Sequence, residues 1–97
     1  MKEYDFNGNL VFEGEYSNGE KNGKGKEFND NSLVFEGEYL NGKRWNGKEK
    51  EYYDNGKLEF EVEYLNGERN GKGKKYDSKG EIEFECEFLN GEINYEK

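Results

Sequence analysis

The sequence of 97 residues contains no proline, no histidine and a single cysteine, Cys86. Without histidine, neither a Cys–His nucleophile nor a zinc site of the usual mixed type can be assembled. A lone cysteine excludes an internal disulfide and is compatible with a reducing compartment, so we expect a cytoplasmic protein. Without proline, nothing marks a linker or a domain boundary, so we expect one domain over residues 1–97. Because histidine is absent and cysteine occurs once, we expect no enzymatic activity, no metal and no cofactor.

Apolar residues are also scarce. Only 30% of the chain is hydrophobic and 16% is aromatic, whereas globular proteins are about 45–50% apolar when glycine is counted. This excludes a thick two-layer core, although the regular placement of the aromatic residues argues against disorder and for a thin folded array. No charged-then-apolar leader and no apolar run of about 20 residues occurs, so we expect neither export nor a membrane anchor.

Negative charge is abundant, with a formal net charge of −8. Such a balance repels nucleic acid phosphates and anionic lipid surfaces unless a basic patch overrides it. Each short lysine run has glutamate within a few residues. We therefore expect no nucleic acid partner and no membrane partner.

The chain is built from copies of one stretch, Phe35-Glu36-Gly37-Glu38-Tyr39-Leu40-Asn41-Gly42. Copies start at Phe12, Phe35, Phe60 and Phe84, at spacings of 23 to 25 residues, which is typical of an array of supersecondary units. We divide the chain into a partial repeat at 1–11, repeats at 12–34, 35–59 and 60–83, and a partial repeat at 84–97. Both ends of this array are expected to be open, as in a segment of a longer array or an oligomer whose ends meet.

Each copy alternates with a period of two residues. Leu10, Phe12, Gly14 and Tyr16 fall on one predicted face, with Val11, Glu13 and Glu15 on the other, and the pattern returns in every copy. This alternation indicates a β-strand and, with the glycine content, argues against a helix. The expected fold is all-β: an elongated, single-layer antiparallel sheet of stacked β-hairpins.

A polar loop with paired Asn-Gly steps follows each strand, at residues 18–23, 41–47 and 66–71, and leads into a Lys-rich second strand. With Tyr16 opposite Gly23, glutamate would face lysine in every hairpin: Glu15–Lys24, Glu13–Lys26, Glu38–Lys48, Glu36–Lys50, Glu63–Lys72 and Glu61–Lys74. Gly14 would face Gly25. Lys24→Glu should then destabilise the protein more than Glu20→Lys in the loop does.

Large rings would occupy the other face, here called the aromatic strip: Phe12, Tyr16, Phe35, Tyr39, Phe60, Tyr64, Phe84 and Phe88. A ring can lie across a neighbouring strand only where that strand has no side chain, which requires glycine there. Glycine is also expected in tight turns, whose backbone conformation disfavours a Cβ. We assign these structural roles to Gly14, Gly19, Gly23, Gly25, Gly37, Gly42, Gly47, Gly67, Gly71, Gly73 and Gly91. Cys86 and Val62 stand where other copies have glycine, and we expect packing roles for them.

These positions resemble the MORN (membrane occupation and recognition nexus) repeat, whose pattern is an aromatic residue, glycine, a second aromatic, a turn glycine and a closing Gly-x-Gly. The first copy matches throughout; the second departs at Trp45 and Glu49, the third at Val62, and the fourth keeps Phe84, Phe88 and Gly91. The resemblance implies a single-sheet stack of hairpins used as a scaffold, interaction or dimerisation module, with lipid binding proposed for some members. Residues 52–58 also resemble a bacterial subfamily that includes antitoxins.

The sequence carries only weak signals for other kinds of chemistry. Residues 19–24 and 67–72 have some likeness to a phosphate-binding loop but lack a spacer and the Ser or Thr after the lysine. Glutamate pairs such as Glu13 and Glu15 recur in every copy, as expected of a solvated face, and the turns at residues 30–32 and 54–56 lack the spaced acidic residues of a calcium loop. Trp45 is either a cover for a neighbouring ring or an exposed anchor for a partner.

The sequence therefore predicts a non-catalytic scaffold that binds a protein, or a second copy of itself, through the aromatic strip, Trp45 or the open ends. The alternative is a small acidic antitoxin that neutralises a basic protein partner. Lipid binding is the weakest of the three predictions, because the net charge opposes it.

Overall fold

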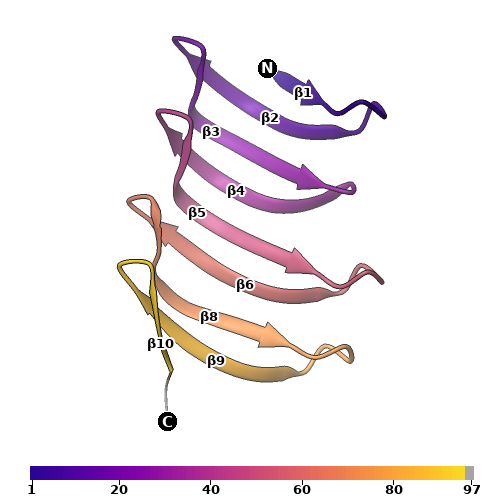
Figure 1. Ribbon diagram of the computed structural model, residues 1–97, viewed down its shortest axis with the longest axis vertical. Helices are drawn as coiled ribbons and strands as arrows, with labels where there is room; N and C mark the ends of the chain where they lie inside the picture. The colour runs from indigo at the N-terminus through magenta and orange to yellow at the C-terminus, as the bar shows by residue number, and fades with distance from the viewer. Residues whose placement is uncertain (96–97) are drawn as a thin grey trace.

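A computed structural model describes residues 1–95. Within these residues the chain forms one open antiparallel sheet and no helix, which confirms the predicted all-β, single-layer fold (Figure 1). The strands are β1 (Lys2–Tyr4), β2 (Leu10–Ser17), β3 (Glu20–Asn29), β4 (Ser32–Leu40), β5 (Lys43–Tyr52), β6 (Leu58–Leu65), β7 (Glu68–Arg69), β8 (Gly71–Tyr76), β9 (Ile82–Leu89) and β10 (Glu92–Tyr95).

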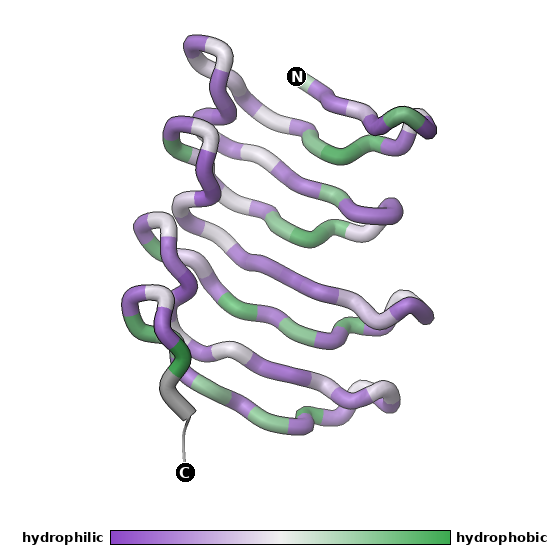
Figure 2. The backbone as a smooth tube through the Cα atoms, viewed as in Figure 1, coloured by the Kyte–Doolittle hydropathy of each residue, from purple (hydrophilic) through white to green (hydrophobic). Residues whose placement is uncertain are grey.

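The strands follow one another across the sheet in chain order, and the short β7 pairs with β6 beside β8. The sheet measures 45 × 31 × 15 Å, with its long axis along the direction in which the strands stack (Figure 1). Hydrophobic segments lie above one another in β2, β4, β6 and β9, and mainly hydrophilic strands separate them (Figure 2). The second strand of each repeat thus spaces the apolar ones.

The hairpins close in two residues rather than in the six- or seven-residue loops expected from the sequence. These tip turns are Asn18-Gly19, Asn41-Gly42, Asn66-Gly67 and Asn90-Gly91, and the next strand starts at the following residue. Both residues of each turn have positive φ, for example 55° at Asn18 and 81° at Gly19, as a type I′ hairpin turn requires. One Asn-Gly step is therefore sufficient, and the rest of each predicted loop belongs to a strand.

The register is correct near the middle of two hairpins and wrong elsewhere. Glu13 faces Lys26, Gly14 faces Gly25 and Glu61 faces Lys74, as predicted. Closer to the turn, however, Tyr16 faces Lys21 instead of Gly23, so the predicted Glu15–Lys24 and Glu63–Lys72 pairs do not form. The tight turn shifts the pairing, and a β-bulge absorbs the surplus residues.

The second hairpin departs further, because Trp45 is an additional residue in it. Glu36 faces Lys48 rather than Lys50, and Glu38 faces Asn46 rather than Lys48. Phe35 consequently lies opposite Glu49. Between repeats the opposite charges do meet, as in the pairs Lys24–Glu38, Lys26–Glu36, Lys48–Glu63, Lys50–Glu61, Lys72–Glu87 and Lys74–Glu85.

A second set of bulges places some apolar side chains on the face opposite to the predicted one. Phe12 lies opposite Glu3 and Leu10 opposite Tyr4; since Glu3 and Tyr4 are neighbours and point to opposite faces, Leu10 cannot share the face of Phe12. The same shift recurs in the later repeats. The outer face therefore carries its own apolar pairs beside the Glu/Lys surface: Tyr4–Leu10, Phe28–Leu33, Tyr52–Leu58 and Tyr76–Ile82.

The buried residues form two clusters on the face of the aromatic strip. Phe12, Phe35 and Tyr39 form the N-terminal core, against which Tyr16 and Tyr64 pack. Val62, Cys86 and Phe88 form the C-terminal core, against which Phe60 packs. Cys86 and Val62 thus have the packing roles that the sequence predicts.

Candidate interaction surface

The aromatic strip is packed ring against ring. Phe12 contacts Tyr16 and Tyr39 edge-on, with ring centroids 5.8 and 5.2 Å apart. Phe35 contacts Tyr39 and Tyr64 in the same way, at 5.5 Å in each case. This geometry sets the positive edge of one ring against the negative face of the next. The rings therefore form a continuous core across β2, β4 and β6.

Three cations lie over these rings, one from each of β3, β5 and β7, which follow the first three tip turns, and we call them the cation row: Lys21, Arg44 and Arg69. Each lies between a ring of its own hairpin and a ring of the next one, with distances to the two ring centroids of 4.4 and 6.0 Å for Lys21, 4.8 and 5.9 Å for Arg44, and 5.7 and 5.6 Å for Arg69. The tips thus bend over the aromatic strip, which makes its face the concave one. We call this concave face the trough.

The cation row changes what the aromatic strip offers to a partner. Phe12, Phe35, Tyr39 and Phe88 are buried, Tyr16, Phe60, Tyr64 and Trp45 are half-buried, and Phe84 is 38% exposed. The chain therefore covers most of the strip itself with cationic side chains. What faces the interior of the trough is a charged surface above the rings.

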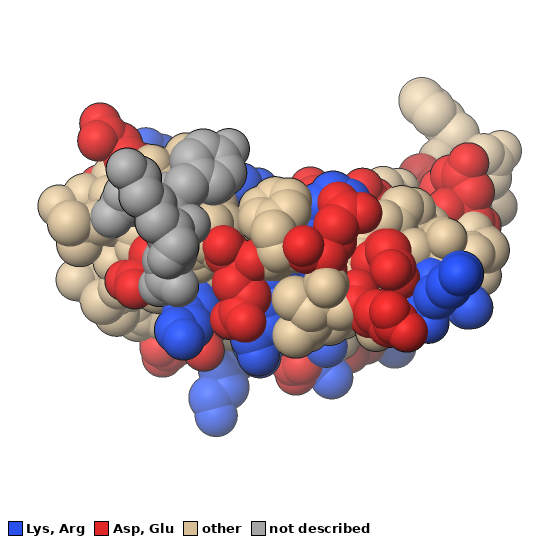
Figure 3. Space-filling model, turned by 90° about the horizontal axis from the view of Figure 1, so that it is seen from below, with Lys and Arg blue, Asp and Glu red and all other residues tan. Residues whose placement is uncertain are grey.

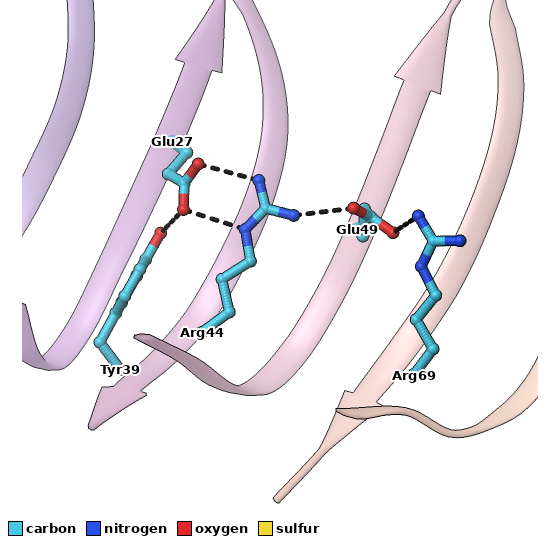
Figure 4. Close-up of polar contacts among 5 residues, drawn as sticks. All are labelled: Glu27, Tyr39, Arg44, Glu49 and Arg69. Carbon is cyan, nitrogen blue, oxygen red and sulfur yellow. Dashed lines mark hydrogen bonds and ion pairs between the residues drawn. The ribbon is translucent and has the colours of Figure 1, made fainter. Parts of the chain in front are cut away.

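A carboxylate network holds the two arginines of the cation row in place (Figure 4). Arg44 donates to both oxygens of Glu27, at 3.0 Å from Nε and 2.8 Å from Nη2, and donates from Nη1 to Glu49 at 2.7 Å. The Tyr39 hydroxyl donates to Glu27 at 2.7 Å. Arg69 Nη2 lies 2.7 Å from the other oxygen of Glu49, as an ion pair without aligned hydrogen-bond geometry. The network runs from β3 to β7.

Glu49 is the most buried charge in it, with 8% of its surface exposed. It stands where the first and third repeats have Gly25 and Gly73. The register shift at Trp45 brings Glu49 opposite Phe35. Glu49 thus takes the position in the second hairpin that Glu27, opposite Phe12, has in the first. Two arginines then balance a carboxylate that would otherwise be too costly to bury.

Contacts within the network fix its charges. Burial would raise the pKa of the Glu27 carboxyl, but hydrogen bonds from Arg44 and Tyr39 outweigh burial and lower that pKa. Burial and the bond to Glu27 both raise the pKa of the Tyr39 hydroxyl. The bond to Glu27 also raises the pKa of the Arg44 guanidinium. Near neutral pH the network therefore keeps a negative Glu27, a neutral Tyr39 and a positive Arg44.

Beside the network, the surface over β4 to β6 has a hollow of about 740 Å³. It extends from Arg44 and Glu49 to the turns at the other end of the strands and includes Val34 and Tyr53. Its charged lining residues are Asp30, Glu49, Glu51, Asp54 and Glu59 on the acidic side and Arg44 and Lys50 on the basic side. Acidic groups outnumber basic ones, so the hollow favours a cationic ligand.

Trp45 takes neither of its two predicted roles in full. Its indole lies against a tip turn: a Cβ added at Gly67 would be 3.1 Å from the ring, and the Trp45 carbonyl accepts a hydrogen bond from the Gly67 amide at 2.9 Å. The side chain is half-buried. Trp45 therefore joins the second hairpin to the third and covers a turn.

The motifs with weak chemical signals are structural elements. Residues 19–24 and 67–72 lie in tip turns and the strands after them. Within residues 1–95, no group of three or more potential metal ligands comes together. That part of the chain also has no helix with the length and apolarity needed to cross a bilayer.

The sequence interpretation missed the cation row and the carboxylates of Glu27 and Glu51. A signal for the cation row was present, because a basic residue follows the turn glycine by two positions in three copies: Gly19-Glu20-Lys21, Gly42-Lys43-Arg44 and Gly67-Glu68-Arg69. In the fourth copy Ile93 takes this place. No comparable repeat singles out Glu49 or Glu51, since their positions depend on the register shift at Trp45.

Comparison with known protein families agrees with this architecture. The MORN repeat matches residues 12–32, 35–45 and 63–82, and a MORN repeat variant matches residues 1–18 and 45–66. Neither match supports the likeness to antitoxins. No curated protein and no solved structure matches the chain. Since the MORN repeat matches cover more than half of the sequence, including the rings and glycines of the N-terminal core, the chain belongs to the MORN repeat family.

Proposed function

We propose that this chain is a non-catalytic protein-interaction module whose hollow binds a basic segment of a partner protein. The observation that carries the proposal is the hollow of about 740 Å³ with its excess of carboxylates. Its size falls within the range of about 300–1,000 Å³ that is usual for binding pockets. A lysine or arginine side chain with its flanking backbone is of the right size and charge.

Three carboxylates of the hollow are available to a ligand. Glu51 and Asp54 are exposed, as is Asp30 across the hollow, and within residues 1–95 none of the three forms an ion pair. Glu49 and Glu59 are instead paired with cations of the chain. A guanidinium or ammonium group placed between the free carboxylates would gain charge-assisted hydrogen bonds without breaking the network.

Protein binding fits this surface better than catalysis or lipid binding does. The chain has no histidine, and its one thiol, on Cys86, is buried, so neither a histidine base nor an accessible cysteine nucleophile is present. The net charge of −8 opposes approach to an anionic bilayer.

The test is a titration with a fluorescent unstructured peptide of about 10 residues rich in Lys and Arg, read by anisotropy at low and high salt. We expect binding that weakens with salt, and no binding of a Glu/Asp-rich peptide of equal length. Glu51→Lys should weaken binding about tenfold, whereas Glu20→Lys, with the same charge change at a tip turn, should have an effect of less than about twofold. Equal losses in both variants would mean attraction by net charge alone and would contradict the proposal.

A further inference from the structure

The second, third and fourth hairpins each carry an exposed leucine directly before the tip turn. We call these residues the leucine row: Leu40, Leu65 and Leu89, which are 38%, 51% and 66% exposed. Hydrophobic segments accordingly lie at these three tips, whereas the first tip, where Ser17 takes the place of leucine, has none (Figure 2). A single exposed leucine is ordinary, but leucines that recur at one repeat position form a patch.

The leucine row lies on the outer face of the sheet. The residue before each leucine belongs to, or packs against, a concave core: Tyr39, Tyr64 and Phe88. Because neighbouring residues of a strand point to opposite faces, all three leucines point outward. Equivalent positions of successive hairpins are two strands apart, which is about 9.5 Å. The row therefore follows the long axis of the sheet and is separate from the hollow.

On the side toward the turns, each turn is contacted by a side chain of the preceding hairpin. Oε2 of Glu20 lies 3.4 Å from the place of a Cβ at Gly42, and Oε2 of Glu68 lies 3.2 Å from that at Gly91. The half-buried indole of Trp45 holds the corresponding place at the third turn, 3.1 Å from a Cβ at Gly67. The leucine row is thus bordered by two carboxylates with an indole between them.

Charges beside the leucine row are mainly negative. Across the turns, Lys43 faces Leu40, but Glu68 faces Leu65 and Glu92 faces Leu89. Glu20, Glu68 and Glu92 are exposed, and none of them forms an ion pair with another described residue. Viewed from the C-terminal end, the stack has uncharged surface at the tips, on the left, with acidic side chains beside it (Figure 3).

Farther from the turns, the outer face is balanced in charge. The glutamate two residues before each leucine has a lysine opposite it on the next strand: Glu38–Lys24, Glu63–Lys48 and Glu87–Lys72. The leucine row therefore has a balanced side toward the middle of the strands and an acidic side toward the turns. A ligand that covers the row gains most from positive charge on one flank only.

We propose that the leucine row, with Trp45 beside it, binds one amphipathic α-helix of a partner protein. An α-helix returns to the same side every seven residues, about 10.5 Å along its axis, which is close to the spacing of the leucines. An extended strand returns to the same face every two residues, about 6.8 Å, and does not match that spacing. The helix has apolar residues at every seventh position and lysine or arginine on the flank that meets Glu20 and Glu68.

This interaction goes beyond the proposed function, because it uses the outer face and leaves the hollow open. A second copy of the chain fits the row less well than a basic helix, since both copies carry a net charge of −8 and repel each other. An anionic bilayer is opposed by the same carboxylates. A basic helix satisfies both the spacing and the charge.

The probe is an alanine-based helical peptide of about 18 residues, with leucine at every seventh position and lysine along one flank. The full chain is titrated with it, and binding is read by anisotropy of a label on the peptide and by emission of Trp45, the single tryptophan of the chain. We expect saturable binding with a shift in Trp45 emission. A peptide of the same composition with leucine at every fifth position should bind at least about tenfold more weakly. Equal binding of both peptides would overturn the proposal.

Two apolar variants of equal exposure locate the contact. Leu65 is 51% exposed in the leucine row, and Ile82 is 52% exposed on the same face, at the other end of the strands. Leu65→Ser should weaken binding of the helical peptide about tenfold, and Ile82→Ser should leave it within about twofold. Circular dichroism confirms that both variants fold. Equal losses would place the contact elsewhere and overturn the proposal.

Charge reversal tests the basic flank. Glu68→Lys should weaken binding about fivefold, whereas Glu81→Lys, with the same charge change in a turn at the other end of the strands, should have an effect of less than about twofold. A helical peptide with glutamate in place of lysine should bind Glu68→Lys more tightly than it binds the unaltered protein. Equal losses in the two variants would mean attraction by net charge alone, against the proposal.

Two further measurements separate the helix from other occupants. If sedimentation or vesicle flotation reveals self-association or lipid binding that Leu65→Ser abolishes, the row serves a second copy or a bilayer and the proposal is wrong. The absence of both effects supports it. Glu51→Lys, which disrupts the hollow, should leave binding of the helical peptide within about twofold, so this inference and the proposed function fail independently.

Discussion

The N-terminal and C-terminal cores have the same strand arrangement but fill it differently. In the N-terminal core, rings lie directly on glycine backbone: a Cβ added at Gly25 would be 2.8 Å from the rings of both Phe12 and Tyr39. In the C-terminal core, Val62 and Cys86 occupy positions that are glycine in the first two repeats, and both are buried. Rings lie on glycine backbone in the second core too, where a Cβ added at Gly73 would be 2.8 Å from Phe88, so the second core differs by its two compact side chains.

Their polar partners differ as well. Glu27 lies between Phe12 and Phe35 and binds Arg44, whereas Lys75 lies at the corresponding place between Phe60 and Phe84. Lys75 reaches Glu59 and Glu83 only at 3.6 Å, on a more exposed surface. The tight ionic network thus covers mainly the N-terminal core, and Arg69 alone extends it over Phe60 and Phe88 of the C-terminal core, which loose surface pairs flank. A MORN array tolerates both solutions because each repeat contacts only its neighbours.

Truncating one ring in each core should give the largest difference. Phe35 is fully buried between Tyr39 and Tyr64, so Phe35→Ala should lower the free energy of unfolding by about 4 kcal/mol. Phe84 is 38% exposed, and Phe84→Ala should cost about 1 kcal/mol. Urea denaturation of both variants measures the two losses. Similar losses at the two sites would mean that the cores do not differ in packing.

Breaking the ionic network should rank next. Arg44 binds both Glu27 and Glu49, and Arg69 binds Glu49 alone. Arg44→Met should therefore destabilise the protein by about 3 kcal/mol, because it leaves buried carboxylate without its main partner. Arg69→Met should cost about half as much, since Glu49 keeps Arg44. Thermal unfolding of the two variants gives the comparison, which fails if Arg69→Met proves the more damaging.

The architecture was readable from the sequence because it depends on local rules. Alternation with a period of two specifies strands, and Asn-Gly steps specify hairpins, so the all-β sheet follows from positions such as Phe35, Gly37 and Tyr39 alone. The glycines that contact rings could also be assigned, because large and small residues recur together at fixed spacing. Repetition supplied four observations of one pattern.

The register and the candidate site could not be read in this way. Turn length and bulges decide which residues face each other, and a one-residue change reverses every side chain beyond it. Leu10 and Phe12 differ in face for this reason, and the insertion of Trp45 moves Glu49 into the concave core. The hollow depends on these shifts, so no period in the sequence predicts it.

Exchanging residues at one repeat position sharpens the contrast. A Cβ at Gly37 would lie 2.6 Å from the Cα of Gly47, so Gly37→Ala must push two strands apart and should cost about 2 kcal/mol by overpacking. Val62 holds the same position in the third repeat and is 1% exposed. Val62→Gly should cost a similar amount, about 2 kcal/mol, by opening a cavity. Chemical denaturation of both variants tests this, and a neutral Gly37→Ala would show that the N-terminal core has room to spare.

Acid should weaken the N-terminal core selectively. The pKa of Glu27 is lower in the folded state than its value of about 4.3 in an unfolded chain. The stabilisation is therefore complete above the unfolded pKa and is lost as pH falls through the folded pKa. Glu27→Gln should flatten the decline of stability below about pH 4.3, and Lys75→Met should leave that decline in place. Melting curves from pH 2 to 7 measure the decline of stability in acid. If Glu27→Gln shows the same decline as the unaltered protein, the pH dependence comes from other groups.

The smallest effects belong to the outer Glu/Lys surface, where the two halves are alike. Lys24 faces Glu38, and Lys72 faces Glu87 at the equivalent place. Each pair is exposed, so Lys24→Glu and Lys72→Glu should each cost only about 0.5 kcal/mol. Glu20→Lys, next to a tip turn, should cost less than Lys24→Glu, because Glu20 faces Ser17 and opposes no lysine across the hairpin. Equal melting shifts for Lys24→Glu and Glu20→Lys would show that cross-strand charge on this face contributes nothing, and that the ordering of the repeats rests on the concave cores alone.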